Sequence, residues 1–396
     1  NTTASNNTAI GHDALNANTT GNTNVAVGQN SLAANTTANN NVAVGGLSLE
    51  ANTTGASNTA VGADTMRANT TASENTAFGY QTLTANTTGS NNTALGNQAL
   101  LSNTTAQFNT GVGHHALENN TTGASNTSVG SDSLRANTTG TQNVAVGAEA
   151  LQAITTVNDC TAVGYQALTS NTSGRENTAF GSQAMDSNTT GEFNDAFGRD
   201  SLGAGSGFDQ CCAFGNSALK MNNADNNSAF GFVCLGANTS GDKNTGIGAS
   251  ALAANTTGLE NTAVGYQALD ACTTGHDNNG FGRDALGGVT TGSKNTAVSA
   301  AGTSITTGSN NLVLGYNAGS SASPSGSITT GSNNVVLGDN NISNLFCADT
   351  SISSSDSRDK TDVASFNIGL DWINALRPVT YRWDRRTWYG TDAEPY

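Results

Sequence analysis

A five-residue phrase of the form N-T-A-V-G recurs along the chain with a period of 17 residues, broken by two steps of 16 and one of 23. The whole unit is N-T-A-V-G-x-x-A-L-x-A-N-T-T-G-x-x, and we number its positions 1 to 17. The 20 copies begin, with Asn or Cys, at residues 7, 24, 41, 58, 75, 92, 109, 126, 143, 160, 177, 194, 211, 227, 244, 261, 278, 295, 311 and 334. A unit this short cannot bury a core alone, so neighbouring copies must stack.

The residue types in the unit favour strands and turns over helices. Gly, Asn and Thr are poor helix formers, whereas the T-A-V run is typical of a strand. Gly at position 5 and the N-T-T-G phrase suit two corners. We therefore predict an all-β parallel β-solenoid, or β-roll, of about 20 coils. Hydrophobic residues make up only 35% of the chain, which fits two large core residues per coil, at positions 4 and 9.

Position 3 of the unit carries Ala, Gly or Ser in the first 18 copies, from Ala9 to Ala297. Side chains alternate along a strand, so position 3 points away from positions 2 and 4. If position 4 lies in the core, position 3 faces outward, where large polar residues would be tolerated. The small residues then predict close packing by another copy of the chain, in a homotrimer about the fibre axis. A tight bend would also favour alanine there.

The pattern weakens towards the C-terminal end of the chain. Thr303 stands at a leucine position, Val313 and Val336 replace the small residue, and residues 320–327 interrupt the period. The predicted parts are regular repeats over 1–300, atypical capping repeats over 301–350 and the incomplete beginning of an α+β C-terminal domain over 351–396. Because the first copy is typical, we expect the array to continue on its N-terminal side.

The segment SSSDSRDKTDVASFNIGLDWINALRPVTYRWD, within residues 353–396, resembles the start of the intramolecular chaperone domain of endosialidases and many phage tail fibres. The Ser-Asp-x-Arg-x-Lys opening and the later R-P-V-x-Y-x-W carry this resemblance. It implies that the domain helps three chains fold together and then cuts itself off between Ser355 and Asp356. It also implies that Ser355 is the nucleophile and Lys360 its general base, a role open to a desolvated lysine. The family usually has Leu where this chain has Asp359.

The repeat array is similar to the long repetitive regions of tail fibres from aquatic phages. More loosely, it resembles the head repeats of trimeric autotransporter adhesins, which share the N-x-apolar-apolar-G phrase. Those repeats are usually shorter than 17 residues and form a trimeric left-handed parallel β-roll. The resemblance implies a trimeric, rod-like assembly.

Charge and composition limit the partners of the chain. A net charge of −15 with 14 Lys and Arg leaves no basic patch for nucleic acid. No apolar run reaches the roughly 18–20 residues of a membrane span. We predict no cofactor and no metal. The His114–His115 pair is interpreted as a surface turn, with a metal site on a trimer axis as the less favoured alternative.

The six cysteines show no metal-ligand spacing. Cys160 and Cys211 replace the Asn of position 1, and Cys272 replaces the Asn of position 12. Cys160 and Cys211 lie three coils apart, roughly 14 Å along the axis. This is too far for a disulfide, which needs Cα atoms within about 7 Å.

Together these features predict a structural and adhesive protein, the shaft of a trimeric viral tail fibre that forms part of the virion and takes part in host attachment. Its predicted partners are two further copies of itself, other tail or baseplate proteins, and a host-surface glycan or protein bound through the variable positions 6, 7, 10, 16 and 17. It is not predicted to be a turnover enzyme; self-cleavage at Ser355–Asp356 is a single event.

The sequence is also compatible with two other classes of protein. The first is a bacterial trimeric adhesin or extracellular filament built from the same repeat. The second is an ice-binding or glycan-depolymerising solenoid. Ice binding needs an unbroken Thr array, and the N-T-T register breaks at Ile154. Glycan hydrolysis needs a close carboxylate pair, whereas the acidic residues of position 7 are several coils apart. Those residues are Asp13, Asp64, Asp132, Asp200 and Asp284.

Overall fold

The computed structural model describes residues 3–344 and 346, which form 20 strands of three residues each and no helix. Each strand covers positions 2 to 4 of one repeat. The strands are β1 Thr8–Ile10, β2 Val25–Val27, β3 Val42–Val44, β4 Thr59–Val61, β5 Thr76–Phe78, β6 Thr93–Leu95, β7 Thr110–Val112, β8 Thr127–Val129, β9 Val144–Val146, β10 Thr161–Val163, β11 Thr178–Phe180, β12 Asp195–Phe197, β13 Cys212–Phe214, β14 Ser228–Phe230, β15 Thr245–Ile247, β16 Thr262–Val264, β17 Asn279–Phe281, β18 Thr296–Val298, β19 Leu312–Leu314 and β20 Val335–Leu337. The predicted parallel β-solenoid is thereby confirmed.

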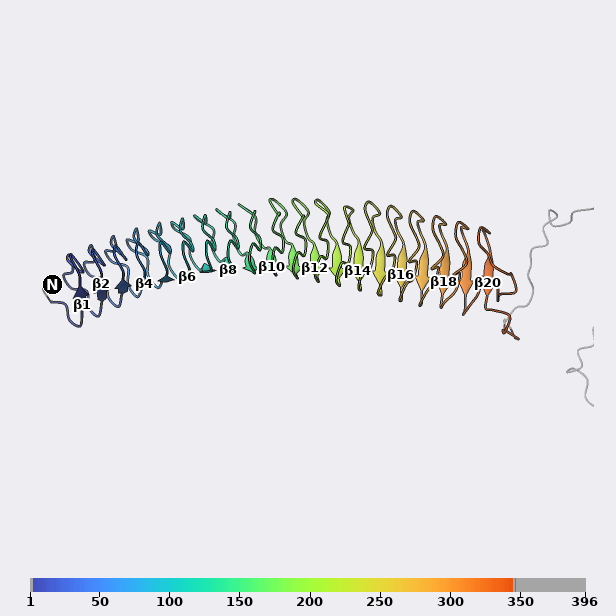
Figure 1. The fold of residues 1–396 in the computed structure, drawn as a ribbon, viewed down its shortest axis with the longest axis horizontal. Helices are drawn as coiled ribbons and strands as arrows, with labels where there is room; N and C mark the ends of the chain where they lie inside the picture. Colours follow the sequence, from blue (N-terminus) through green and yellow to red (C-terminus); the bar gives the residue numbers. More distant parts are fainter. Residues whose placement is uncertain (1–2, 345, 347–396) are drawn as a thin grey trace, which may run out of the picture. The chain divides into compact units, whose positions relative to one another are not determined.

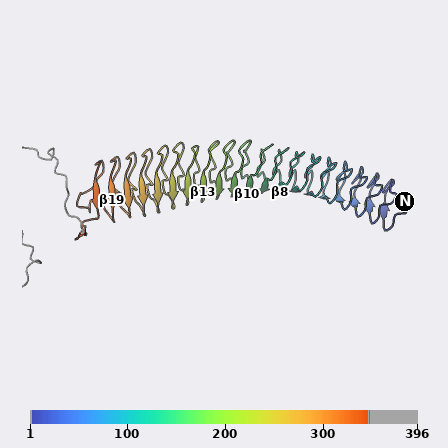
Figure 2. The ribbon, with the colours of Figure 1, turned by 180° about the vertical axis from the view of Figure 1, so that it is seen from behind.

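Consecutive coils stack in chain order, with the strands along one side and the loops along the other (Figures 1 and 2). Each strand pairs in parallel with the next, and equivalent repeat positions face each other, as Ala26 faces Ala43. The chain divides into two units, Asn1–Ser343 and Asn344–Tyr396, and the solenoid forms the first.

Backbone hydrogen bonds between coils continue around the loops. The amide of Leu15 donates to the carbonyl oxygen of Ser31 in the following coil at 2.9 Å, whereas the amide of Asn30 donates to His12 in the preceding coil at 2.9 Å. Each coil therefore satisfies its backbone groups through its neighbours on both sides. This explains why one repeat is not a folding unit, because an isolated coil would leave these groups unpaired.

The interior contains a single column of large aliphatic side chains. Leu or Met at position 9 is buried in all 17 coils from Leu15 to Leu286, as predicted. The small residue at position 3 packs against this column: a Cβ added to Gly111 would lie 3.3 Å from Cγ of Leu100 in the preceding coil. Position 3 is small because the coil's own interior leaves no more room.

The two faces of the strand are therefore the reverse of those predicted. The middle residue of every strand from β2 to β20 is buried, whereas the position 4 residues are half-buried or exposed. Position 4 is not part of the core, and position 3 does not face another chain. Both predictions were wrong for one reason. The large apolar residue of position 4 was assigned to the interior. The coil is narrow, so its interior holds alanine from the strand, at position 3, and leucine from the opposite side, at position 9.

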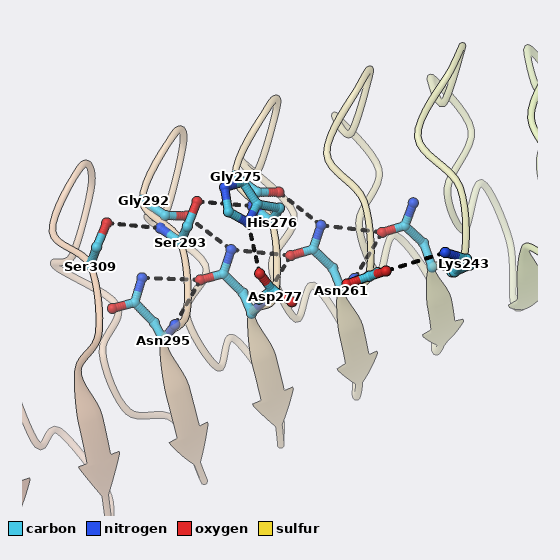
Figure 3. Close-up of polar contacts among 12 residues, drawn as sticks. Lys243, Asn261, Gly275, His276, Asp277, Gly292, Ser293, Asn295 and Ser309 are labelled. Carbon is cyan, nitrogen blue, oxygen red and sulfur yellow. Dashed lines mark hydrogen bonds and ion pairs between the residues drawn. The ribbon is translucent and has the colours of Figure 1, made fainter.

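Asparagine fills much of the remaining interior through two columns of amide groups. At position 1, Nδ2 of Asn261 donates to the carbonyl oxygen of Gly275 at 2.8 Å, and Oδ1 accepts from the backbone amide of Asn278 at 3.0 Å (Figure 3). At position 12, Nδ2 of Asn103 donates to Oδ1 of Asn86 at 3.0 Å, and its Oδ1 accepts from Asn120 at 2.9 Å. The amides replace apolar volume with paired hydrogen bonds, which is how a chain with so few large side chains fills its core.

The corners of the coil use left-handed backbone at more positions than glycine occupies. Gly28 at position 5 has φ 137°, as the sequence suggests, but Asn30, Leu32 and Asn40 at positions 7, 9 and 17 have φ 54°, 50° and 60°. A non-glycine residue in this region costs roughly 1–2 kcal/mol. At position 9 the burial of leucine, worth about 1.5–3 kcal/mol, offsets that cost.

The last coils fill their interior with different residues. The leucine column ends at Leu286, and beyond it Ile305 and Val313 are fully buried while Ile328 is nearly so. The inserted residues 320–327 form a detour from the coil, and the amide of Ile328 returns to the carbonyl oxygen of Gly319 at 3.1 Å. Larger residues at position 3 thus accompany the loss of leucine at position 9, so the volume of the core is maintained.

Candidate functional site

The outward side of the strands carries a row of apolar side chains at position 4, accompanied at position 2 mostly by threonine. We call positions 2 and 4 of β1–β20 the outer strand row. In a typical strand of this row, β3, Val42 and Val44 are half-buried while Ala43 between them is fully buried. The exposed members at position 4 are Ile10, Phe78, Leu95, Phe180, Phe214, Phe230, Ile247, Phe281, Val298 and Leu337. Contiguous exposed apolar surface of this kind marks a site of interaction.

Four phenylalanines form a stack within the outer strand row. The ring centroids of Phe180 and Phe197 are 5.1 Å apart, those of Phe197 and Phe214 4.3 Å, and those of Phe214 and Phe230 5.2 Å, with ring planes within 10° of parallel. Parallel register places these rings directly above one another, since equivalent positions pair from coil to coil. This stretch is the stacked aromatic part of the row.

The variable positions lie on the loops and carry exposed polar and aromatic groups. Tyr80, Tyr165 and Tyr266 at position 6 are each about half exposed. A shallow depression of about 400 Å³ is formed by positions 14 to 17 of three consecutive coils. In its lining, Nε of Arg175 lies 3.0 Å from Oε2 of Glu192. The same guanidinium lies 5.5 Å from the ring centre of the exposed Phe193.

The acidic residues of position 7 form surface ion pairs. Each lies close to a basic side chain: Asp13 to His12 at 3.0 Å, Asp64 to Arg67 at 3.5 Å, Asp132 to Arg135 at 3.2 Å, Asp200 to Lys220 at 3.6 Å and Asp284 to Arg283 at 3.3 Å. Surface pairs of this kind contribute little to stability. Among the described residues, one group of three could hold a metal ion, namely His114, His115 and Asp132.

The described cysteines are all free thiols, so Cys160 and Cys211 do not pair, as predicted. Burial raises the pKa of Cys160 and Cys272 to about 11 and that of Cys211 and Cys234 to about 12. These thiols stay protonated and unreactive at neutral pH, because the thiolate is the reactive form.

The residues predicted to carry out self-cleavage, Ser355, Asp356 and Lys360, lie outside the part of the chain that the structure describes. Sequence comparison does reach them: residues 355–394 match the family model described as the chaperone of endosialidase. The match begins at Ser355, the residue before the predicted cut. A comparison with curated proteins finds no match.

A parallel β-solenoid of 17-residue repeats followed by a segment similar to the endosialidase chaperone fits a tail-fibre-like protein. The described part of the chain contains no helix with the length and hydropathy needed to span a membrane. In the described coils, the buried side chains and the backbone groups are used in stacking.

Proposed function

We propose that the chain is the shaft of a viral tail fibre, a stiff rod that holds a host-recognition surface away from the virion. The observation that carries this proposal is the order of the two parts: a solenoid of 20 coils is followed by residues 355–394, which match the endosialidase chaperone family. A chaperone segment placed after a repetitive rod suits a chain that must be brought into register with its partners.

Three copies of the chain assemble through the outer strand row in this proposal. Support comes from the burial pattern, since the row leaves apolar residues exposed on strands from β1 to β20. Burying such a row releases roughly 25 cal/mol per Å² of apolar surface. The position 3 residues play no part in assembly, because they are inside each coil.

Assembly can be tested by substituting one residue of the phenylalanine stack in the full chain. Phe197→Asp places a charge between Phe180 and Phe214, and sedimentation should change from a trimer to a monomer or a weakened trimer. Phe193→Asp is the matched control, because Phe193 is exposed two residues before the strand and outside the row. A monomeric native chain, or equal trimer formation by both variants, would contradict assembly through this surface.

The C-terminal segment cleaves itself once in the proposed function. Lys360 accepts the proton of the Ser355 hydroxyl, whose oxygen bonds to the carbonyl carbon of the Ser355–Asp356 peptide. The C–N bond breaks, Asp356 leaves as an amine that takes the proton from Lys360, and water hydrolyses the resulting ester. The net change is hydrolysis: one water is consumed, Ser355 gains a carboxyl group and Asp356 gains a free amine. Mass measurement of the complete fibre chain should show a cut after Ser355 that is absent in Ser355→Ala and retained in Ser354→Ala. A native fibre that remains uncut would refute the cleavage.

Recognition of a host glycan or protein belongs to the loop positions 6, 7, 10, 16 and 17. The depression around Arg175 offers a guanidinium and carboxylates, and the ring of Phe193 lies 5.5 Å from that guanidinium; groups of these kinds bind polar ligands such as sugars. Attachment to tail or baseplate proteins would lie elsewhere on the fibre.

A bacterial trimeric adhesin is the alternative use of the same rod. Detection of the chain in purified virions by mass spectrometry would distinguish the two.

A further inference from the structure

Two histidines and an aspartate from adjacent coils gather at one point on the loops. His114 and His115 follow Gly113 directly after β7, and Asp132 occupies the equivalent place after β8, which puts it beside His115. One ligand atom from each of the three residues lies within 4.8 Å of the other two. The imidazole rings of His114 and His115 have centroids 3.5 Å apart. Three potential ligands therefore meet at the junction of two coils.

The hydrogen bonds of His115 determine which of its two ring nitrogens is unprotonated and can act as a metal ligand. The side-chain amide of Gln98 is oriented by its own Nε2, which donates to Oε1 of Gln81 at 3.1 Å. Oε1 of Gln98 lies 2.7 Å from Nε2 of His115, and because this oxygen can only accept, Nε2 of His115 carries the hydrogen. In the neutral ring, Nδ1 is then the unprotonated nitrogen.

This nitrogen faces negative charge. Nδ1 of His115 lies 3.3 Å from Oδ1 of Asp132 and 4.0 Å from Oε2 of Glu118. A lone pair directed at a carboxylate oxygen is repulsive unless a cation lies between them, either a proton on Nδ1 or a metal ion. Histidine with one nitrogen held by an outer hydrogen bond and the other free is the usual arrangement of a metal ligand.

The charges nearby also favour a cation. Arg135 supplies one positive charge, with Nε 2.7 Å from Oε2 of Glu118 and Nη1 3.2 Å from Oδ1 of Asp132. Two carboxylates against one guanidinium leave a net negative charge beside the imidazoles. Asp132 keeps its second oxygen, Oδ2, which accepts only from the exposed hydroxyl of Ser131 at 3.0 Å. Oδ1, the oxygen that faces Nδ1 of His115, is shared with Arg135, and Arg135 keeps its contact with Glu118 when a metal ion takes Oδ1.

We propose that His114, His115 and Asp132 bind a divalent transition-metal ion of the zinc class and link the β7 coil to the β8 coil. Two imidazole nitrogens and one carboxylate oxygen suit Zn²⁺ better than Ca²⁺ or Mg²⁺, which prefer oxygen ligands. In a tetrahedral site with bonds of about 2.0–2.1 Å, ligand atoms are roughly 3.4 Å apart. The 3.3 Å between Nδ1 of His115 and Oδ1 of Asp132 matches that spacing. Three protein ligands leave one position open to water or to an external ligand.

The chain offers close controls for this site. His12 with Asp13, at 3.0 Å, and His276 with Asp277, at 2.8 Å, are exposed pairs that lack a second imidazole. Each substitution in the test introduces a residue that another repeat has at the same position. Position 6 is Asn97 in the preceding coil and position 7 is Gln98, so His114→Asn and His115→Gln restore ordinary loop residues.

The experiment is a titration of the full chain, produced without a histidine tag, with Zn²⁺ by calorimetry and with Co²⁺ by visible absorption. We expect one ion per chain, a tetrahedral cobalt spectrum, and a rise in the thermal midpoint with zinc. His114→Asn and His115→Gln should each weaken binding at least about tenfold, the effect of losing roughly 1.4 kcal/mol. His12→Asn and His276→Asn should bind as the native chain does. Failure of the native chain to bind zinc, or equal binding by all four variants, would overturn the proposal.

Discussion

Gly246 in β15 lies directly against the thiol of Cys234, and a Cβ on Gly246 would overlap its Sγ. Cys234 stands at position 8, where the other coils from Ala14 to Ala285 have Ala, Ser or Thr, and Gly246 stands at position 3 of the next coil, where most have Ala. The larger side chain in one coil is accommodated because the next coil has lost a methyl group. This pairing shows how little free volume the interior contains.

Gly246→Ala should therefore destabilise the solenoid by about 1–3 kcal/mol, the usual cost of overpacking a core. The double variant Cys234→Ala with Gly246→Ala restores the common pair and should recover most of that loss. Denaturant unfolding of the four proteins in this cycle measures the coupling. Gly111→Ala is the control, because its added Cβ would lie no closer than 3.3 Å to its neighbours. Equal losses for Gly246→Ala in both backgrounds would show that the cysteine is not responsible.

The asparagine column at position 12 predicts a difference between two otherwise similar substitutions. Oδ1 of Asn103 accepts from Asn120, whereas Oδ1 of Asn137 has no partner, because the next residue of the column is Ile154. Asn103→Ala removes one hydrogen bond more than Asn137→Ala, so it should cost about 1 kcal/mol more. Thermal or urea unfolding of the two variants measures this. A larger loss for Asn137→Ala would contradict the role given to the column.

Sequence periodicity was sufficient to predict the coil, its parallel stacking and the buried leucine of position 9. It could not assign the faces of the strand, because Ala26 and Val27 are both apolar and alternation alone does not say which points inward. The answer depends on the width of the coil, which follows from left-handed residues such as Leu32 that propensity does not predict. The cluster of His114, His115 and Asp132 was missed because Asp132 lies 17 residues away from His115 in sequence. Reading each position down its column of coils would have brought the two together.

Thiol labelling should distinguish Cys212 from the other cysteines that the structure describes. Cys212 at position 2 of β13 points to the outer strand row and is half-buried, whereas Cys160, Cys211 and Cys234 are buried. In a Cys347→Ser background, maleimide at neutral pH should modify one thiol per native chain, at Cys212, and five after unfolding. Peptide mapping identifies the site. If assembly covers the outer strand row, maleimide should label Cys212 faster in Phe197→Asp than in the native fibre. Rapid labelling of a buried thiol would contradict the packing of the coils.

Buried thiols should make the solenoid less stable in alkaline solution. The pKa of Cys211 is raised by burial from an ordinary value of 9.0 to about 12. Below pH 9 both folded and unfolded chains keep this proton, so the thiol gives no pH dependence. Between pH 9 and about 12 the unfolded chain releases the proton while the folded chain retains it. The free energy of unfolding therefore falls with rising pH, by up to about 1.4 kcal/mol per pH unit for each such thiol.

The comparison that isolates this effect is Cys211→Asn, which restores the usual residue of position 1. Other groups titrate in the same range, but they are common to both proteins, so the difference in unfolding free energy between them reports the thiol. That difference should be constant below pH 9 and should then shift in favour of the asparagine variant up to about pH 12. Urea unfolding at intervals from pH 7 to the alkaline limit provides the measurement. Parallel pH profiles would mean that the Cys211 thiol ionises as readily in the folded chain as in the unfolded one, which its burial in the position 1 column does not allow.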